Sequence, residues 1–199
     1  MKTTTARIAT AALGAAAAFV ALAALDFNRP AAKPSPQEAA AARVARGEYL
    51  VQAIGCTHCH SPKVMGPHGP EEDRARFLAG HPEGSALPEP PKPVGPWIAT
   101  SSWDLTAWSG PWGVSYAMNL TPDENTGIGS WSETTFVQAL RTGKHMGVSR
   151  PILPPMPWDS FRKLSDEDLK SIYAYLRTIP AVHNRVPDPI EPAEQTPSK

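Results

Sequence analysis

Residues 56–60 read CTHCH, so two thiols stand two residues apart and an imidazole directly follows the second thiol. Cys56 and Cys59 are the only cysteines of the chain. Three kinds of chemistry use such a pattern: a redox-active dithiol, half of a structural zinc site, and a covalently attached haem. Each of them requires different surroundings in the sequence.

The surroundings of the two cysteines suit neither a dithiol nor zinc. A thioredoxin-type pair opens a helix after a strand, whereas residues 37–54 are rich in alanine and have the apolar spacing of a helix. A structural zinc site normally has a second ligand pair, and the sequence contains no second C-x-x-C and no H-x-x-x-H. His58 and His60 are too close to the thiols in sequence to complete such a site easily.

Covalent haem accounts for all three side chains. Thioethers from Cys56 and Cys59 can hold the two vinyl-derived carbons of a porphyrin, and His60 then supplies an imidazole nitrogen to the iron. C-x-x-C-H is the attachment motif of haem c. We therefore predict one covalent haem c on Cys56 and Cys59, with His60 as an axial ligand of the iron.

A haem that carries electrons commonly has a methionine sulfur as its second axial ligand. Once the methionine of the N-terminal segment and the one just after His60 are set aside, Met118, Met146 and Met156 remain. Met156 lies within RPILPPMPW, residues 150–158, where prolines on both sides fix φ and remove donors. This stiff loop predicts Met156 as the second ligand. Met146 is the main rival, and a core-filling role is the alternative for Met156.

Three stretches with the apolar spacing of helices must position these side chains: residues 37–54, 130–143 and 165–180. Ser130 with Glu133, and Ser165 with Asp168, resemble capping boxes at the starts of the second and third. Because Gly47 lacks a side chain, the third helix could cross the first one there. We therefore expect an all-α fold, with helices around one haem and long proline-rich loops.

The composition limits the classes of partner. The chain has 199 residues, 23 of them proline, and its 19 basic residues balance its 19 acidic residues. This balance gives no indication of a nucleic-acid partner. The length suits one sizeable core, and the many prolines require long irregular segments.

The N-terminus reads as a targeting segment. Lys2 and Arg7 form a basic start, residues 8–25 carry no charge, and residues 21–23 offer a small-residue cleavage site. The apolar stretch just reaches the length of a membrane span, so both a cleaved signal peptide and an uncleaved anchor are open. In either case we expect a periplasmic domain, soluble or anchored to the inner membrane.

The segment between the haem motif and the second helix is the hardest to interpret. Residues 62–96 hold nine prolines, and four tryptophans follow within residues 97–112. We expect an extended strap over the haem edge, with a partner-docking surface as the alternative. The remaining histidines have no ligand-like neighbours in sequence and are expected on the surface or in hydrogen bonds: His68, His81, His145 and His183.

The order of these features resembles a class I c-type cytochrome. The stretch NLTPDENTGIGSWSETTFVQALRTGKHMG, followed by PPMPW, is similar to the cytochrome c domains that accompany membrane-bound bacterial alcohol and sugar-acid dehydrogenases. The resemblance covers residues 40–180 and implies Cys56 and Cys59 on the haem, with His60 and Met156 on the iron. Such subunits often carry three haem domains, whereas this chain has one attachment motif and a long insertion before Asn119.

Together these observations predict a periplasmic electron-transfer protein that is not itself an enzyme. Its redox partners would be a dehydrogenase, an oxidase or another cytochrome. A five-coordinate haem enzyme or gas-binding sensor is the alternative. The expected domains are a signal or anchor (1–25), a proline-rich linker (26–36), a cytochrome c domain (37–180) with an insertion (62–118), and a loose tail (181–199).

Overall fold

The computed structural model describes residues 33–91 and 96–192. The candidate targeting segment (1–25) and most of the linker (26–36) lie outside the described residues. Within the part of the chain that is described, no helix combines the length and apolarity needed to cross a membrane. The chain divides into two units at residue 38, and the second unit contains the CTHCH motif.

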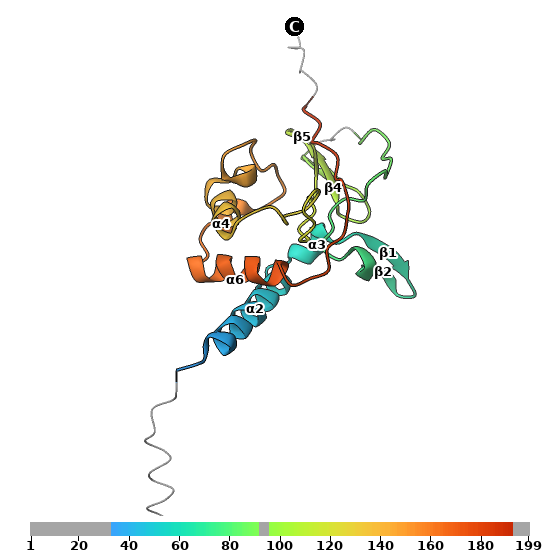
Figure 1. Cartoon of the computed structure of the whole chain (residues 1–199). Coiled ribbons are helices and arrows are strands. Elements are labelled where there is room, and N and C mark those ends of the chain that lie inside the picture. The colour runs from blue at the N-terminus through green and yellow to red at the C-terminus, as the bar shows by residue number, and fades with distance from the viewer. Residues whose placement is uncertain (1–32, 92–95, 193–199) are drawn as a thin grey trace, which may run out of the picture. The chain divides into compact units, whose positions relative to one another are not determined.

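Five α-helices and two short 3-10 helices form in the described ranges (Figure 1). The α-helices are α2 (Pro36–Ala53), α3 (Cys56–His60), α4 (Glu133–Thr142), α5 (Trp158–Phe161) and α6 (Asp166–Leu176). The 3-10 helices are η1 (Arg74–Arg76) and η2 (His145–Gly147). The three long helices match the three stretches whose apolar spacing predicts them, although α2 begins one residue earlier, at Pro36.

The all-α prediction is wrong, because two antiparallel sheets form within the insertion at residues 62–118. One is the hairpin β1 (Lys63–Gly66) with β2 (Gly69–Glu72). The other has the order β3 (Thr100–Ser101), β4 (Ala107–Gly110), β5 (Gly113–Tyr116). The insertion is therefore partly sheet and not a wholly extended strap.

Helix α4 starts two residues later than its expected cap. Ser132, not Ser130, is the N-cap, and its hydroxyl accepts a hydrogen bond from the Thr135 N–H at 3.0 Å. The helix ends as expected at Gly143, which adopts φ 67° and donates its N–H to the Ala139 carbonyl. The apolar face between these ends is buried, as its spacing predicts.

Helix α6 confirms both its predicted cap and its predicted crossing point. The Ser165 hydroxyl accepts from the Asp168 N–H at 3.1 Å. At the crossing with α2, a Cβ added to Gly47 would lie 1.9 Å from the Ser171 carbonyl oxygen, so only glycine fits. Beside this contact the Arg46 guanidinium pairs with the Asp168 carboxylate at 2.9 Å. Gly47 is thus a packing requirement of the helix pair.

The core lies where α2, α4 and α6 meet. It is made of buried aliphatic and aromatic side chains: Leu50, Val51, Leu78, Ile128, Trp131, Phe136, Ala139, Leu140, Leu169, Ile172 and Leu176. Burial of such side chains is the main favourable term that holds these helices together.

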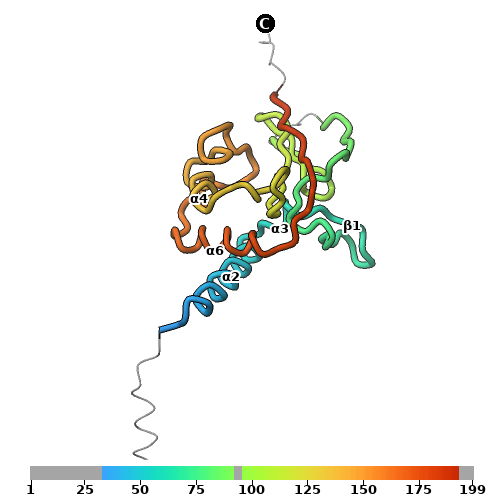
Figure 2. Tube along the Cα trace, viewed as in Figure 1, coloured from blue at the N-terminus to red at the C-terminus, as the bar shows by residue number. Residues whose placement is uncertain are grey.

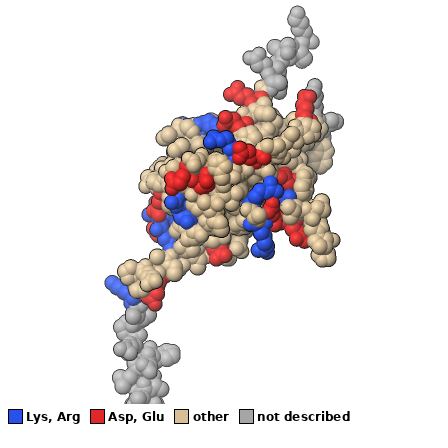
Figure 3. Space-filling model, turned by 45° about the vertical axis from the view of Figure 1, so that its right-hand side comes forward, with Lys and Arg blue, Asp and Glu red and all other residues tan. Residues whose placement is uncertain are grey.

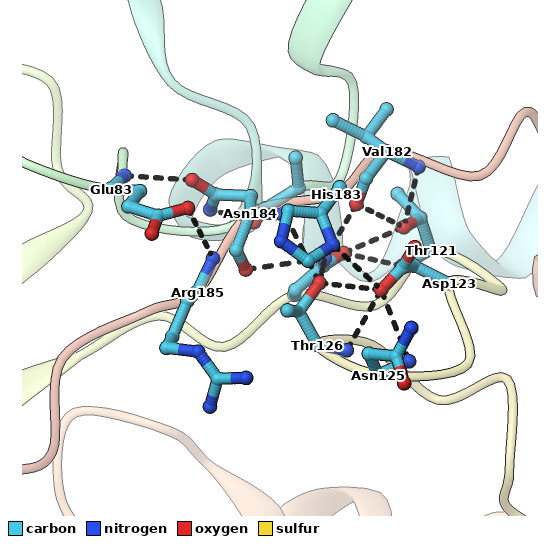
Figure 4. A network of polar contacts seen from close by, with 11 residues as sticks. Glu83, Thr121, Asp123, Asn125, Thr126, Val182, His183, Asn184 and Arg185 are labelled. Carbon is cyan, nitrogen blue, oxygen red and sulfur yellow. Dashed lines mark hydrogen bonds and ion pairs between the residues drawn. The ribbon is translucent and has the colours of Figure 1, made fainter.

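The segment after α6 is not a loose tail as far as it is described. It runs back along the second sheet (Figure 2), where Ile190 and Val114 exchange backbone hydrogen bonds of 2.8 and 2.9 Å. Asn184 is 5% exposed, and its side-chain amide donates to the Ala79 and His81 carbonyls at 2.6 and 2.9 Å. Figure 4 shows the polar network around this asparagine. Residues 193–199 lie outside the described residues.

Candidate functional site

A cavity of about 380 Å³ lies against the core, and helices, sheet and loops all contribute to its wall. Its volume falls in the range of about 300–1,000 Å³ typical of small-molecule and cofactor sites. Cys56, Cys59, His60 and Met156 all line it. The fold thus brings all four predicted site residues to one cavity, although Met156 is far from the others in sequence.

The short helix α3 presents the cysteines and the histidine together. Gly55 adopts φ 79° just before it, a left-handed conformation that ends α2 and lets a new helix start at Cys56. Residues three apart on a helix share a face, which places both thiols toward the cavity. At the other end the Lys63 ammonium donates to the Ser61 carbonyl at 2.6 Å and to the His58 carbonyl at 3.1 Å.

His60 is held in one tautomer. The residue is 8% exposed, and its Nδ1–H donates to the Met118 carbonyl at 2.8 Å. This hydrogen bond leaves Nε2 as the unprotonated nitrogen, the form that binds a metal ion. Burial holds the pKa of His60 below its usual value, although the bond to Met118 opposes this shift. The imidazole is therefore neutral and oriented.

The two thiols are not those of a reactive dithiol. Burial raises the pKa of Cys56 to about 11, and burial also raises the pKa of Cys59, against the lowering effect of the Lys63 ammonium. Redox-active pairs have lowered thiol pKa values, so this environment argues against that chemistry. Nor does the described part of the chain contain a cluster of three or more His, Cys, Asp or Glu side chains suited to a metal ion.

The methionines occupy different environments. Met156 is partly buried against the core and lines the cavity, whereas Met146 is 44% exposed and lies outside the lining. Met118 also lines the cavity, but its carbonyl accepts the His60 hydrogen bond and so lies on the same side as that ring. Met65 is exposed, in agreement with its exclusion. Location therefore favours Met156 as the second sulfur donor.

The sequence interpretation did not assign the second sheet, Arg150 or His145 to the cavity lining. Trp108 on β4 and Ser115 on β5 line the cavity. Arg150 is the only charged side chain among its described lining residues, and its carbonyl accepts the His145 N–H at 2.9 Å. His145 also lines the cavity and packs edge-on against Trp131 at 5.2 Å. The tryptophan cluster was the one sequence signal for this wall.

The other histidines are hydrogen-bonded or exposed, as predicted. His81 is 1% exposed, and its Nδ1 lies 2.8 Å from the Thr106 hydroxyl oxygen. The His183 ring lies 3.6 Å from the Asp123 carboxylate, and His68 is exposed. Basic and acidic side chains lie interspersed on the face shown in Figure 3, which agrees with the balanced composition.

The donor set and the wall fit a haem c. The cavity offers two free thiols at helical spacing, one neutral imidazole nitrogen and one thioether in an otherwise largely apolar lining. Arg150, an exposed residue that contributes to the lining, is the one basic residue there of a type suited to the carboxylate groups that a haem carries. Apolar walls and soft sulfur ligands are the features by which proteins hold such a group.

Comparisons with known proteins agree with this fit. The model of the family described as cytochrome c matches residues 44–180. The fructose dehydrogenase cytochrome subunit of Gluconobacter japonicus is 31% identical over 157 residues, which cover 79% of this chain and 25% of that protein. The gluconate 2-dehydrogenase cytochrome c subunit of Pantoea cypripedii is 35% identical over 134 residues, or 67% of this chain and 22% of that protein.

A third relative extends the match. The cytochrome c subunit of alcohol dehydrogenase (quinone) from Gluconobacter oxydans (strain 621H) is 29% identical over 176 residues, covering 86% of this chain and 28% of that protein. The chain thus spans about a quarter of the length of these relatives. With the attachment motif, the cavity and the family match in agreement, the chain belongs to the cytochrome c family.

Proposed function

We propose that this protein is a one-electron carrier with a single haem c attached to Cys56 and Cys59 and ligated by His60 and Met156. The observation that carries the proposal is the shared cavity, which two thiols, an oriented imidazole and a thioether all line. When bound, a haem supplies one-electron exchange between Fe(III) and Fe(II). The protein itself is not a catalyst.

The chain's own residues explain why carriage, and not catalysis, is the better proposal. The hydrogen bond to the Met118 carbonyl orients His60, which offers one nitrogen. Met156 offers one sulfur from the proline-rich loop at residues 150–158. If His60 and Met156 both bound the iron, no protein-free position would remain on it for oxygen or peroxide. The largely apolar lining would limit contact of a bound haem with water, and a thioether ligand would favour its reduced state; both effects would raise its potential.

A dehydrogenase is the proposed electron donor. The three relatives are cytochrome subunits of fructose, gluconate and alcohol dehydrogenases. The downstream acceptor would be an oxidase or another cytochrome. Export is proposed from the basic start at residues 2–7 and the uncharged stretch at residues 8–25, which would place the haem domain in the periplasm, free or anchored to the inner membrane.

Covalent attachment is tested on a denaturing gel. The exported wild-type chain should keep its haem stain after denaturation, and the double variant Cys56→Ala, Cys59→Ala should lose it. Release of haem from the wild type by acid–acetone would contradict the attachment.

The ligand set is tested by a reduced-minus-oxidised spectrum of the purified protein. A methionine–iron charge-transfer band in the oxidised form, with no binding of carbon monoxide by the reduced form, would support a carrier. Absence of the band together with ready carbon monoxide binding would indicate a five-coordinate haem enzyme or gas sensor instead.

A further inference from the structure

The connection that carries Met156 contains few groups able to anchor it. We call this connection, residues 151–157, the methionine strap. Four of its seven residues are prolines, which have no N–H to donate. The hydrogen bonds of the other N–H groups are local: Ile152 donates to the Gly143 carbonyl and Met156 to the Leu153 carbonyl. The carbonyl groups of the strap are therefore its main sites for a hydrogen bond from the rest of the chain.

Ser115 on β5 donates such a hydrogen bond. Its hydroxyl donates to the Pro154 carbonyl at 2.6 Å, and the side chain is buried at 7% exposure. Among the described residues this is the only hydrogen bond that joins the strap to a part of the chain outside residues 143–161. The nearby Trp108 carbonyl lies 3.5 Å from the same hydroxyl, so its single proton is directed to Pro154.

The hydroxyl is itself oriented by the sheet. The Trp112 indole N–H donates to the Ser115 oxygen at 3.2 Å, which turns the hydroxyl proton away from Trp112. Strand β5 is paired with β4 on one side, and Val114 exchanges two backbone hydrogen bonds with Ile190 on the other. Ser115 therefore projects from a strand that is held on both edges.

We infer that the inserted sheet β3–β4–β5 is a positioning element for the candidate ligand Met156, acting through the hydrogen bond from Ser115 to Pro154. The inference rests on the proposed function, in which Met156 binds the iron. A thioether is a weak ligand, so its occupancy depends on how little freedom the strap regains when the sulfur is displaced. The Ser115 bond restricts that freedom and so opposes displacement.

The test uses imidazole as a competing ligand for the oxidised holoprotein. Ser115→Ala should bind imidazole about five- to tenfold more tightly than the wild type, the change that corresponds to one buried hydrogen bond. Trp112→Phe keeps an aromatic ring and removes the indole donor, so it should shift the affinity in the same direction by a smaller factor. Ser115→Thr keeps the hydroxyl and should restore the wild-type affinity.

Ser109→Ala on β4 is the matched control, because it removes a hydroxyl from the neighbouring strand and leaves the strap contact intact. It should bind imidazole as the wild type does. If Ser115→Ala shows the same imidazole affinity as Ser109→Ala, the inference is overturned, even if its unfolding midpoint falls.

The same measurement separates this inference from the proposed function. If Met156→Ala retains the methionine–iron band, the ligand assignment fails and the positioning role fails with it. If Met156→Ala loses the band but Ser115→Ala binds imidazole like the wild type, the ligand assignment stands and only the positioning role fails.

Discussion

Met156 and Met146 lie on the same connection between α4 and α6, yet only Met156 reaches the cavity. Met156→Ala should abolish the methionine–iron band, admit carbon monoxide and lower the midpoint potential by on the order of 100 mV, a fraction of the roughly 0.8 V over which axial ligands set haem potentials. Visible spectroscopy and a redox titration measure all three changes.

Met146→Ala is the matched control, because this side chain is 44% exposed and lies outside the cavity lining. It should leave the band, the potential and the carbon monoxide response unchanged. The reverse pattern would assign the ligand to Met146 and reduce the PPMPW loop to packing.

Among the histidines outside the proposed ligand set, His81 is the most deeply buried, and burial holds its pKa below the usual value despite the opposing Asp104 carboxylate. The unfolded chain therefore binds a proton at a higher pH than the folded chain does. Above the unfolded pKa of about 6.5, His81 does not reduce the free energy of unfolding. As the pH falls below that value and through the lower folded pKa, the free energy of unfolding decreases by at most about 1.4 kcal/mol per pH unit.

The predicted pH dependence is tested by denaturant unfolding of the holoprotein between pH 7 and pH 5. His81→Gln should flatten the decline in unfolding free energy, whatever its effect at pH 7, although the lowered pKa of His145 will leave part of the slope. The exposed His68→Gln should keep the wild-type slope. An unchanged slope in His81→Gln would show that this histidine does not titrate with unfolding.

At the scale of elements, the crossing of α2 and α6 depends on one missing side chain. Gly47→Ala should lower the free energy of unfolding by about 1–3 kcal/mol, because its Cβ would meet the Ser171 carbonyl oxygen at 1.9 Å. Helix propensity alone predicts the opposite sign, a gain of about 0.5–1 kcal/mol. Chemical denaturation of the holoprotein measures the sign directly.

A second substitution on α2 measures the effect of helix propensity alone on the free energy of unfolding. Ala45 is exposed on the same helix, so Ala45→Gly should cost about 0.5–1 kcal/mol without touching α6. Both variants should thus be destabilised, although they change helix propensity in opposite directions. A stabilised Gly47→Ala protein would show that α2 and α6 do not cross closely at this residue.

The helices were predictable because their signals are local. The Ser165 cap, the Gly143 end and the apolar stripes are each contained within a few residues, and the error at Ser130 arose because Ser132 is an equally good cap two residues later. The strands were not predictable, because none exceeds four residues and their pairing depends on tertiary contacts. Arg150 and Ser115 could not be assigned to the site for the same reason.

At the scale of the whole molecule, the behaviour of residues 8–25 decides where the haem domain works. If this stretch is retained, the protein should sediment with membranes and resist extraction by high salt. A chain in which a cleavable signal replaces residues 2–25 should be found in the soluble periplasm with the same spectrum. Mature wild-type protein that begins near Ala24, measured by mass spectrometry, would exclude the anchor.

The segment at residues 182–190, which packs beside β5, can complete the cavity only after the preceding part of the chain has been made. All four candidate cofactor residues precede it, so they leave the ribosome before it does. Only afterwards can Asn184 donate to the Ala79 and His81 carbonyls, Ile190 pair with Val114 on β5, and Pro189 add to the cavity lining. A chain that has not yet docked residues 182–190 would therefore present CTHCH beside a cavity that lacks Pro189 on this side.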